Sequence, residues 1–180
     1  MDKVIEYIKS DLYKYTNKTS FCAGVKCYFF NPTFRWQVAF RVVNANAGIV
    51  KYIGVFLWII NRNRSRIQIS RHTKIGFGLY IGHNGPIVIN PSCVIGNNCN
   101  LSQFTTIGSN KGQAAIIGDG VYIGPNVCIV ENVRIGNNVT IGAGSIVTKD
   151  IPDNATAVGN YAKVIHFNNP GRFINFYNME

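Results

Sequence analysis

The chain has 180 residues, with 18 Lys and Arg against 8 Asp and Glu, a formal net charge of +10 and 47% hydrophobic residues. This length suits one domain, or one domain with an extension. The apolar content argues against a disordered polycation, and five cysteines with no CxxC pair argue against a disulfide framework or a zinc knuckle. The charge indicates an anionic partner, such as nucleic acid, an anionic membrane surface or a phosphorylated ligand.

Residues 1–66 are predicted to be a basic helical region. Apolar residues recur at helical spacing in 4–12 and 34–43, with a break at Asn31-Pro32, and a third apolar helix is expected over 48–60 after a turn at 44–48. That last run has 13 residues and contains a lysine, whereas a membrane span needs about 20 residues.

The positive charge is confined to the first part of the chain. Residues 1–74 have a net charge of +10 and residues 75–180 a net charge of 0. We expect these helices to form a cap on the rest of the protein. Contact with an anionic membrane is the alternative for the last helix and for Arg62, Arg64 and Arg66, which follow it. The aromatic residues fall in apolar runs rather than between basic residues, which argues against nucleic-acid binding.

The first residues also lack the continuous apolar stretch of a secretory signal, because charged residues interrupt them every few positions. We therefore expect a cytoplasmic protein, with a peripheral place at the inner face of the cell membrane if the last helix makes that contact.

From residue 69 the sequence follows a six-residue period, which predicts a repeat domain over 67–165. Each unit opens with an aliphatic residue, and Gly follows directly in eight of the thirteen units. The opening residues are Ile69, Ile75, Ile81, Ile89, Ile95, Leu101, Ile107, Ile117, Ile123, Ile129, Ile135, Ile141 and Val147. A hexapeptide period is the signature of a parallel β-helix in which three units complete each coil. We therefore predict a mainly β protein, with four coils or slightly more after the helices and a tail over 166–180.

The period is interrupted twice. Two extra residues enter around His83-Asn84-Gly85-Pro86, and four enter in the loop 109–115. Insertions in a regular solenoid tend to carry function. His72, His83 and His166 lack the spacing of a metal site, so no metal is expected.

Three segments carry a resemblance to a known family: IGFGLYIGHNGPIVINPSCVIG (75–96), TTIGSNKG (105–112) and IGDGVYIGPNVCIVENVRIGNNVTIGAGSIVTKDIPDNATAVGN (117–160). They resemble the left-handed β-helix acyltransferases of the hexapeptide-repeat class, in the serine acetyltransferase-like branch that includes capsular and exopolysaccharide O-acetyltransferases of the colanic acid type. The resemblance implies a homotrimer that uses acetyl-CoA as acyl donor.

The resemblance also implies roles for single residues. His83 falls on the general base of the family, which takes the proton of the attacking hydroxyl. The candidates for the remaining contacts are Gln68 to orient the imidazole, Asn84 and Asn100 to contact the acceptor, Gly108 to stabilise the oxyanion through its N–H, and Ala143, Thr148, Lys149, Lys163 and Lys111 to bind the cofactor.

The chain departs from the serine acetyltransferases at three positions. In that family an aspartate 15 residues before the histidine orients it, another directly precedes it, and a second histidine lies in the later loop; this chain has Gln68, Gly82 and Ala114 there. We therefore expect the acceptor to be a saccharide hydroxyl, in a capsular or exopolysaccharide precursor that can be lipid-linked. Serine O-acetylation and a non-catalytic hexapeptide scaffold are the alternatives.

Overall fold

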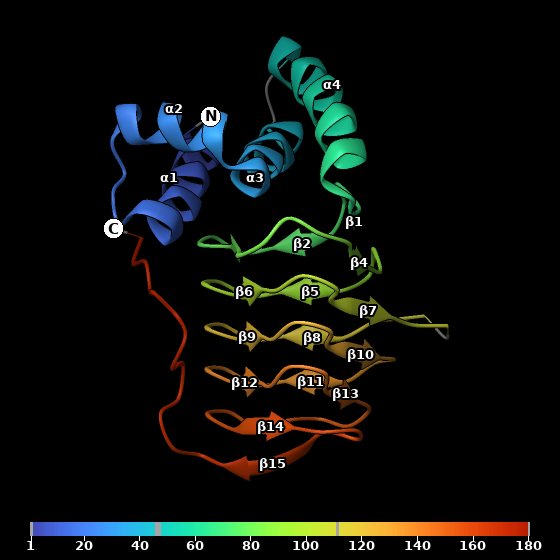
Figure 1. Ribbon diagram of the computed structural model, residues 1–180. Helices are drawn as coiled ribbons and strands as arrows, with labels where there is room; N and C mark the ends of the chain where they lie inside the picture. Colours follow the sequence, from blue (N-terminus) through green and yellow to red (C-terminus); the bar gives the residue numbers. More distant parts are fainter. Residues whose placement is uncertain (1, 46–47, 111, 180) are drawn as a thin grey trace.

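The computed structural model describes residues 2–45, 48–110 and 112–179, which form α-helices followed by a stack of short strands (Figure 1). The helices are α1 (Asp2–Thr16), α2 (Phe21–Phe30), α3 (Pro32–Val43) and α4 (Gly48–Ser65). The strands are β1 (Ile67–Ile69), β2 (Lys74–Ile75), β3 (Tyr80–Ile81), β4 (Ile87–Ile89), β5 (Val94–Ile95), β6 (Asn100–Leu101), β7 (Thr106–Gly108), β8 (Ile116–Ile117), β9 (Tyr122–Ile123), β10 (Cys128–Val130), β11 (Arg134–Ile135), β12 (Thr140–Ile141), β13 (Ile146–Val147), β14 (Thr156–Val158) and β15 (Lys163–His166). The helices gather at one end of the stack (Figure 1).

Three sheets form the walls of a prism. Their strand orders are β1-β4-β7-β10-β13, β11-β8-β5-β2 and β15-β14-β12-β9-β6-β3. Consecutive strands up to β13 therefore lie in different walls, and each pairs in parallel with the strand one coil away. A chain that visits three walls in turn is a parallel β-helix, so the fold predicted from the six-residue period is confirmed.

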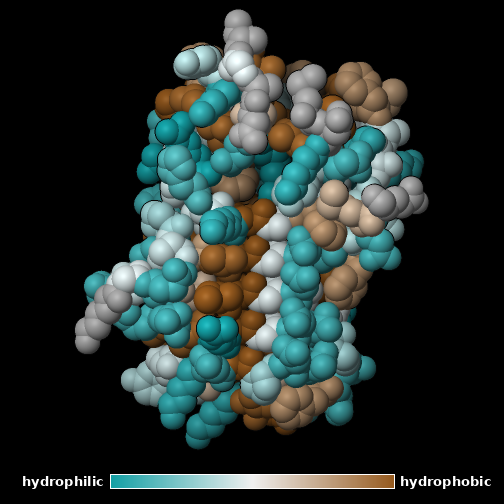
Figure 2. Space-filling model, turned by 180° about the vertical axis from the view of Figure 1, so that it is seen from behind, coloured by the Kyte–Doolittle hydropathy of each residue, from teal (hydrophilic) through white to brown (hydrophobic). Residues whose placement is uncertain are grey.

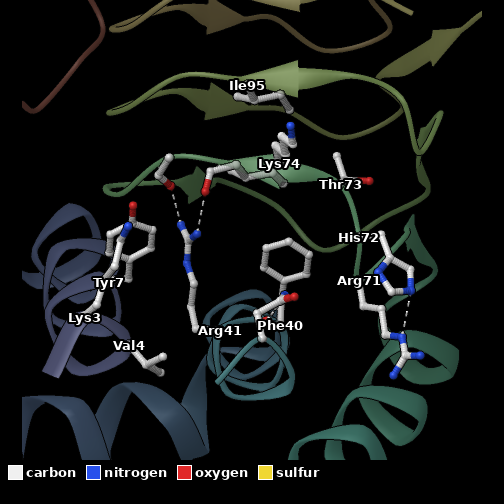
Figure 3. Close-up of a pocket in the computed structure, with 13 residues that line it drawn as sticks. Lys3, Val4, Tyr7, Phe40, Arg41, Arg71, His72, Thr73, Lys74 and Ile95 are labelled. Atoms are coloured by element: carbon white, nitrogen blue, oxygen red, sulfur yellow. Dashed lines mark hydrogen bonds between the residues drawn. The ribbon is translucent and has the colours of Figure 1, made fainter. Parts of the chain in front are cut away.

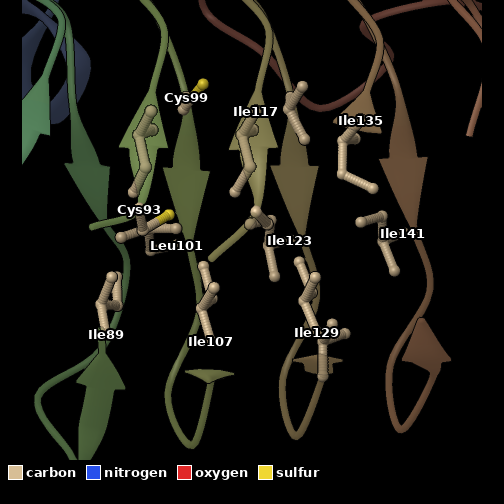
Figure 4. Packing of buried hydrophobic residues seen from close by; sticks show 14 of the residues in the cluster. Ile89, Cys93, Cys99, Leu101, Ile107, Ile117, Ile123, Ile129, Ile135 and Ile141 are labelled. Atoms are coloured by element: carbon tan, nitrogen blue, oxygen red, sulfur yellow. The ribbon is translucent and has the colours of Figure 1, made fainter. Parts of the chain in front are cut away.

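The core consists of three columns of stacked aliphatic side chains (Figure 4). Register places the opening residues of the thirteen hexapeptide units in these columns, and each of them is at most 9% exposed. The columns are Ile69, Ile89, Ile107, Ile129 and Val147; Ile75, Ile95, Ile117 and Ile135; and Ile81, Leu101, Ile123 and Ile141. Burying one such side chain away from water contributes about 1.5–3 kcal/mol to the stability of the folded protein.

The chain turns at the corners of the prism through small residues and through residues in the left-handed backbone conformation. Asn98, Asn126 and Asn138 have φ values of 55°, 57° and 56°, a left-handed conformation that asparagine tolerates better than most residues. Gly96 is required by close approach, because a Cβ atom there would lie 2.5 Å from the carbonyl oxygen of Gly118 in the next coil.

The helices follow the predicted pattern in part. Asn31 ends α2 and caps α3, since its side-chain oxygen accepts hydrogen bonds at 3.1 Å from the N–H groups of Thr33 and Phe34, and Pro32 begins α3. The break at Asn31-Pro32 is therefore confirmed. Helix α4 runs to Ser65, beyond the predicted end at 60, and α1 and α2 are separate helices. Of the predicted turn at 44–48, residues 46 and 47 lie outside the described residues.

The helical cap covers the open edge of the first coil. The Gln37 amide donates to the carbonyl of Leu79 at 2.6 Å, the Thr33 hydroxyl donates to the carbonyl of Ile81 at 2.9 Å, and the Tyr15 hydroxyl accepts from the Ile81 N–H at 3.2 Å. An uncovered strand edge is a site of unwanted pairing. These side chains satisfy the edge and fix the cap on the prism.

The C-terminal tail runs back along the prism toward the helices (Figure 1). The Asn100 side chain donates to the carbonyl of Phe173 at 2.8 Å, and the Phe173 ring lies with its centroid 4.8 Å from that of Tyr122. The Tyr177 N–H donates to the side chain of Asn98 at 2.9 Å. The tail thus packs on the wall that contains β6 and β9.

Apolar side chains remain exposed on two helices of the cap. They are Phe21, Val25, Phe29 and Phe30 on α2, and Tyr52, Ile53, Phe56 and Ile59 on α4. Within the described part of the chain, no helix combines the length and apolar character needed to cross a membrane.

Candidate active site

His83 lies in the first insertion, at the corner that joins β3 to β4. Both His83 and its neighbour Asn84 are exposed. Within the described residues, the His83 side chain has no hydrogen-bond partner, and neither a carboxylate nor Gln68 orients its ring. The imidazole is therefore free to meet a substrate at this corner.

The His83 corner continues along the length of the prism. Backbone hydrogen bonds link it from coil to coil: Phe104 N–H to Pro86 C=O at 2.7 Å, Asn126 N–H to Gln103 C=O at 3.1 Å, and Gly144 N–H to Pro125 C=O at 2.8 Å. Ala143 therefore lies at the same corner as His83, three coils away. At the usual strand spacing, this separation is about 14 Å. The structure thus places the predicted base and one predicted cofactor contact on a single edge of the prism.

A groove of about 450 Å³ lies between the end of α4 and the wall that begins with β1, on the side where β1, β4 and β7 end; the His83 corner lies on the side where β4 begins. Gln68 and Gly108, which the sequence places 40 residues apart, both line the groove. Trp58 and Arg62 also line it and are among the residues not predicted as site residues. The Trp58 indole N–H is buried without a partner in the described part of the protein, and the Arg62 guanidinium lies 5.3 Å from the centre of the Trp58 ring. His83 is not among the described residues that line the groove.

The second insertion is held at both of its ends. Glu131, one coil further on, accepts hydrogen bonds from the Ser109 hydroxyl at 3.0 Å and from the Asn110 N–H at 3.3 Å. At the other end, the Ala114 N–H donates to the Ser92 hydroxyl at 2.9 Å. The loop therefore has a fixed path at its start and end. Lys111, the predicted cofactor contact in this loop, lies outside the described residues.

The remaining predicted contacts are distributed over the prism. Asn100 lies on β6, in a different wall from Gln68, and is 7% exposed because the tail covers it. The structure therefore does not bring Asn100 into the groove. Thr148 and Lys149 are exposed after β13, and Lys163 is exposed at the start of β15. These three residues lie at the end of the prism opposite the helices (Figure 1).

The buried cysteines are poor nucleophiles. Burial raises the pKa of the Cys93 thiol and of the Cys99 thiol to about 12. Thiols with such pKa values stay protonated at neutral pH, and the thiolate is the reactive form. Among the described residues, no three His, Cys, Asp or Glu side chains gather as a metal site.

Comparison with known proteins supports the fold and revises the expected acceptor. The family described as bacterial transferase hexapeptide (six repeats) matches residues 114–149. Serine acetyltransferase 3, mitochondrial, of Arabidopsis thaliana is 34% identical over 169 residues, which cover 90% of this chain and 43% of that protein. Serine acetyltransferase of Staphylococcus aureus is 36% identical over 104 residues, or 56% of this chain and 49% of the relative. The chain thus spans about half the length of the curated relatives it matches.

Two solved structures are also similar. The serine acetyltransferase of Neisseria gonorrhoeae in complex with serine is 27% identical, with a TM-score of 0.71 over 91% of this chain and 69% of that one. The soybean serine acetyltransferase complexed with serine is 26% identical, with a TM-score of 0.75 over 92% of this chain and 70% of that one. The similarity therefore includes the helical cap as well as the prism.

These comparisons contradict the expectation of a saccharide acceptor. The matched proteins are serine acetyltransferases and not specifically capsular or exopolysaccharide O-acetyltransferases. The expectation rested on three side-chain differences, at Gln68, Gly82 and Ala114. The absence of particular acidic and basic groups does not by itself build a saccharide site, and Ala114 is fully buried, so its side chain offers no contact to any acceptor. The chain therefore has a parallel β-helix fold and resembles the hexapeptide-repeat transferases, the serine acetyltransferases among them.

Proposed function

We propose that the protein is an acetyl-CoA-dependent acetyltransferase that transfers the acetyl group to the hydroxyl of serine. The observation that carries this proposal is the similarity to serine acetyltransferases over about nine-tenths of the chain, at 34% identity for the Arabidopsis relative. Two of the similar structures contain serine. This similarity extends through the cap, so it does not reflect the hexapeptide repeat alone.

His83 acts as the general base in this proposal. A hydroxyl has too high a pKa to attack a thioester efficiently, and an imidazole can take its proton as the new bond forms. The serine oxygen attacks the thioester carbonyl carbon, the tetrahedral intermediate collapses, and CoA leaves as a thiol that takes up the proton. The buried Cys93 and Cys99, with their raised pKa values, argue for direct transfer without a covalent acyl-enzyme. Gly108 remains the predicted oxyanion donor.

The edge of the prism that runs from His83 to Ala143 supports a binding place for the acyl donor, acetyl-CoA. An extended ligand lying along this edge would span about three coils, with its thioester at the exposed imidazole. Lys149 and Lys163 are exposed near the far end of the prism, where they can meet phosphate groups. Acetyl-CoA supplies the activated acyl group when it is bound, and these residues hold and orient it.

The groove beside α4 supports the placement of an amino-acid acceptor. Serine carries a carboxylate, and the guanidinium of Arg62 lies in the groove with no carboxylate partner among the described residues. Arginine binds carboxylates through two parallel hydrogen bonds. We assign the Arg62 guanidinium to bind the serine carboxylate. The Gln68 side chain would make a second polar contact with the same serine. Because His83 does not line this groove, the base for a serine bound here would come from the His83 corner of another copy in the proposed trimer.

A homotrimer and a peripheral membrane contact are further proposals about the assembly. Figure 2 shows an apolar stripe along the prism between hydrophilic margins, which supports packing against another copy. The exposed Tyr52 and Phe56 on α4, with the basic residues that follow, support contact with an anionic membrane.

A thiol-release assay tests the acceptor. The enzyme is incubated with acetyl-CoA and L-serine, and in parallel with neutral saccharides or with no acceptor. We expect CoA release that depends on serine, with O-acetylserine detected by mass spectrometry. Arg62→Gln should raise the KM for serine more than tenfold with a smaller effect on the KM for acetyl-CoA. CoA release that does not increase with serine would contradict the proposal, and failure to bind acetyl-CoA would favour a non-catalytic scaffold.

A further inference from the structure

A second cavity lies between the helical cap and the first coil (Figure 3). Its volume is about 560 Å³, within the range of about 300–1,000 Å³ for small-molecule pockets. The walls come from α1, from α3 and from residues 71–76, and none of the lining residues belongs to the groove that contains Gln68 and Gly108. It is therefore separate from the candidate active site.

Three of the lining residues carry positive charges and have no carboxylate partner among the side chains that the structure describes. Lys3 comes from α1, and Arg71 and Lys74 come from the first coil (Figure 3). No Asp or Glu is among the described residues that line the cavity. In the described part of the chain, the ion pairs are Lys9 with Glu6 and Arg41 with Asp11, so none of the three is neutralised.

Two of these cations contact uncharged aromatic or imidazole groups, which do not neutralise their positive charges. The Lys3 ammonium lies 5.7 Å from the centre of the Tyr7 ring, and the Arg71 Nε–H donates to His72 Nε2 at 3.2 Å. Neither contact supplies a negative charge. Like charges that line one cavity repel one another, and an anion bound in the cavity lowers that repulsion.

The other residues that line the cavity indicate what kind of ligand would fit it. Arg41 is 4% exposed and forms an ion pair with Asp11. It is therefore a structural residue of the cavity wall and not a cation available to a ligand. Thr73 is 4% exposed, and its hydroxyl oxygen is buried without a partner among the described residues, although buried hydroxyls are normally paired. Phe40 and Ile95 add apolar surface. The cavity therefore combines cations and apolar surface with room for a compact organic group, while the buried Thr73 hydroxyl is not exposed to it.

We propose that this cavity binds a phosphate-bearing small molecule. A phosphate group offers several oxygens and up to two negative charges, which suits the fork of Arg71 and the point charges of Lys3 and Lys74. The same cations contribute to the net charge of +10 in residues 1–74. Part of that charge excess would then belong to a defined ligand site between the cap and the prism.

Binding is tested by calorimetry with two probes, inorganic phosphate and glycerol 3-phosphate, and with neutral glycerol as the reference. We expect saturable binding of both anions and none of glycerol. Tighter binding of glycerol 3-phosphate would identify a phosphate ester as the ligand, and equal binding would identify free phosphate. No acetyl transfer is needed in this measurement, so its failure and failure of the proposed serine acetylation are distinguishable.

Variants locate the bound anion. The double variant Arg71→Gln/Lys74→Gln should weaken phosphate binding at least about tenfold, because two charged contacts are lost. Lys18→Gln, which removes one exposed charge from the same end of the protein, should change binding less than about twofold. Denaturant unfolding of each variant shows that it is folded. Unchanged binding in the folded double variant would place the anion elsewhere, for example at Lys149 and Lys163, and would overturn the proposal, as would absence of saturable binding to the wild type.

Discussion

Asp11 of α1 and Arg41 of α3 form a two-point ion pair at the interface between the cap and the first coil, with Nε–Oδ2 and Nη2–Oδ1 distances of 2.9 and 3.0 Å. Their side chains are 1% and 4% exposed. Arg41 also donates to the carbonyls of Ile75 and Gly76 at 2.9 and 2.6 Å, and Asp11 accepts from the Leu79 N–H at 2.8 Å. One ion pair therefore joins two helices and both ends of a turn in the prism.

Breaking this pair should destabilise the cap strongly. Asp11→Asn leaves the Arg41 charge buried without its counter-ion, and we expect a loss of about 3–5 kcal/mol in the free energy of unfolding. Glu6→Gln, which breaks the exposed pair with Lys9, should cost less than about 1 kcal/mol. Urea unfolding followed by tryptophan fluorescence measures both. Similar losses in the two variants would show that the buried pair has no special part in holding the cap.

Lys14 gives the stability a predictable pH dependence. Burial lowers the pKa of this amine from 10.5 to about 8. Between these two pKa values the unfolded chain binds more protons at this position than the folded chain, so the free energy of unfolding rises with pH in that window. The rise from this group is at most about 3 kcal/mol.

The comparison of wild type with Lys14→Met isolates that contribution. The other titrating groups are shared, so the difference between the two unfolding free energies should shift in favour of the wild type as the pH increases from 8 to 10.5. Unfolding curves at several pH values provide the measurement. A difference that stays constant with pH would mean that Lys14 titrates in the folded protein as it does in the unfolded chain.

An added methyl group is expected to destabilise the protein at Gly96 and to have little effect at Gly108. A Cβ atom at Gly96 would lie 2.5 Å from the Gly118 carbonyl oxygen, whereas one at Gly108 would have no atom within 4 Å. Gly96→Ala should cost about 1–3 kcal/mol or more, because backbone of two coils must separate. Gly108→Ala should change the free energy of unfolding by less than about 0.5 kcal/mol. Equal thermal stability of the two variants would contradict the observed coil spacing.

Membrane contact through α4 predicts binding to vesicles of anionic phospholipid. Tyr52 is 77% exposed and Phe56 is 65% exposed, so their rings are available to the interface. The wild type should sediment with anionic vesicles and not with neutral ones, and Tyr52→Ser/Phe56→Ser should abolish this. Retention of the wild type in the supernatant at low ionic strength would rule the contact out.

The regular part of the fold could be predicted from the sequence because the period alone determines which side chains point inward. All thirteen opening residues lie in the core columns, and the first insertion places His83 at an exposed corner. Asn31-Pro32 likewise indicated a helix boundary through its own capping chemistry. These features depend on local pattern and backbone conformation.

The grooves and cavities could not be predicted in this way, because they depend on how the cap is fixed on the prism. Lys3 on α1 and Lys74 on β2 line one cavity although they lie 71 residues apart, and Trp58 reaches the groove of Gln68 only because α4 ends above β1. The acceptor was predicted wrongly for a related reason. Three substituted side chains indicated which charged groups were missing, but missing groups do not define which acceptor binds.

The most direct test of the proposed function is the rate of O-acetylserine formation by wild type and by His83→Ala, with His72→Ala as the matched control. Loss of a general base should reduce turnover about 10²–10⁴-fold while binding of CoA is retained. His72→Ala, which alters an exposed histidine outside the corner, should keep its turnover. The account predicts a large loss in His83→Ala alone. Near-normal turnover of L-serine by His83→Ala would contradict it.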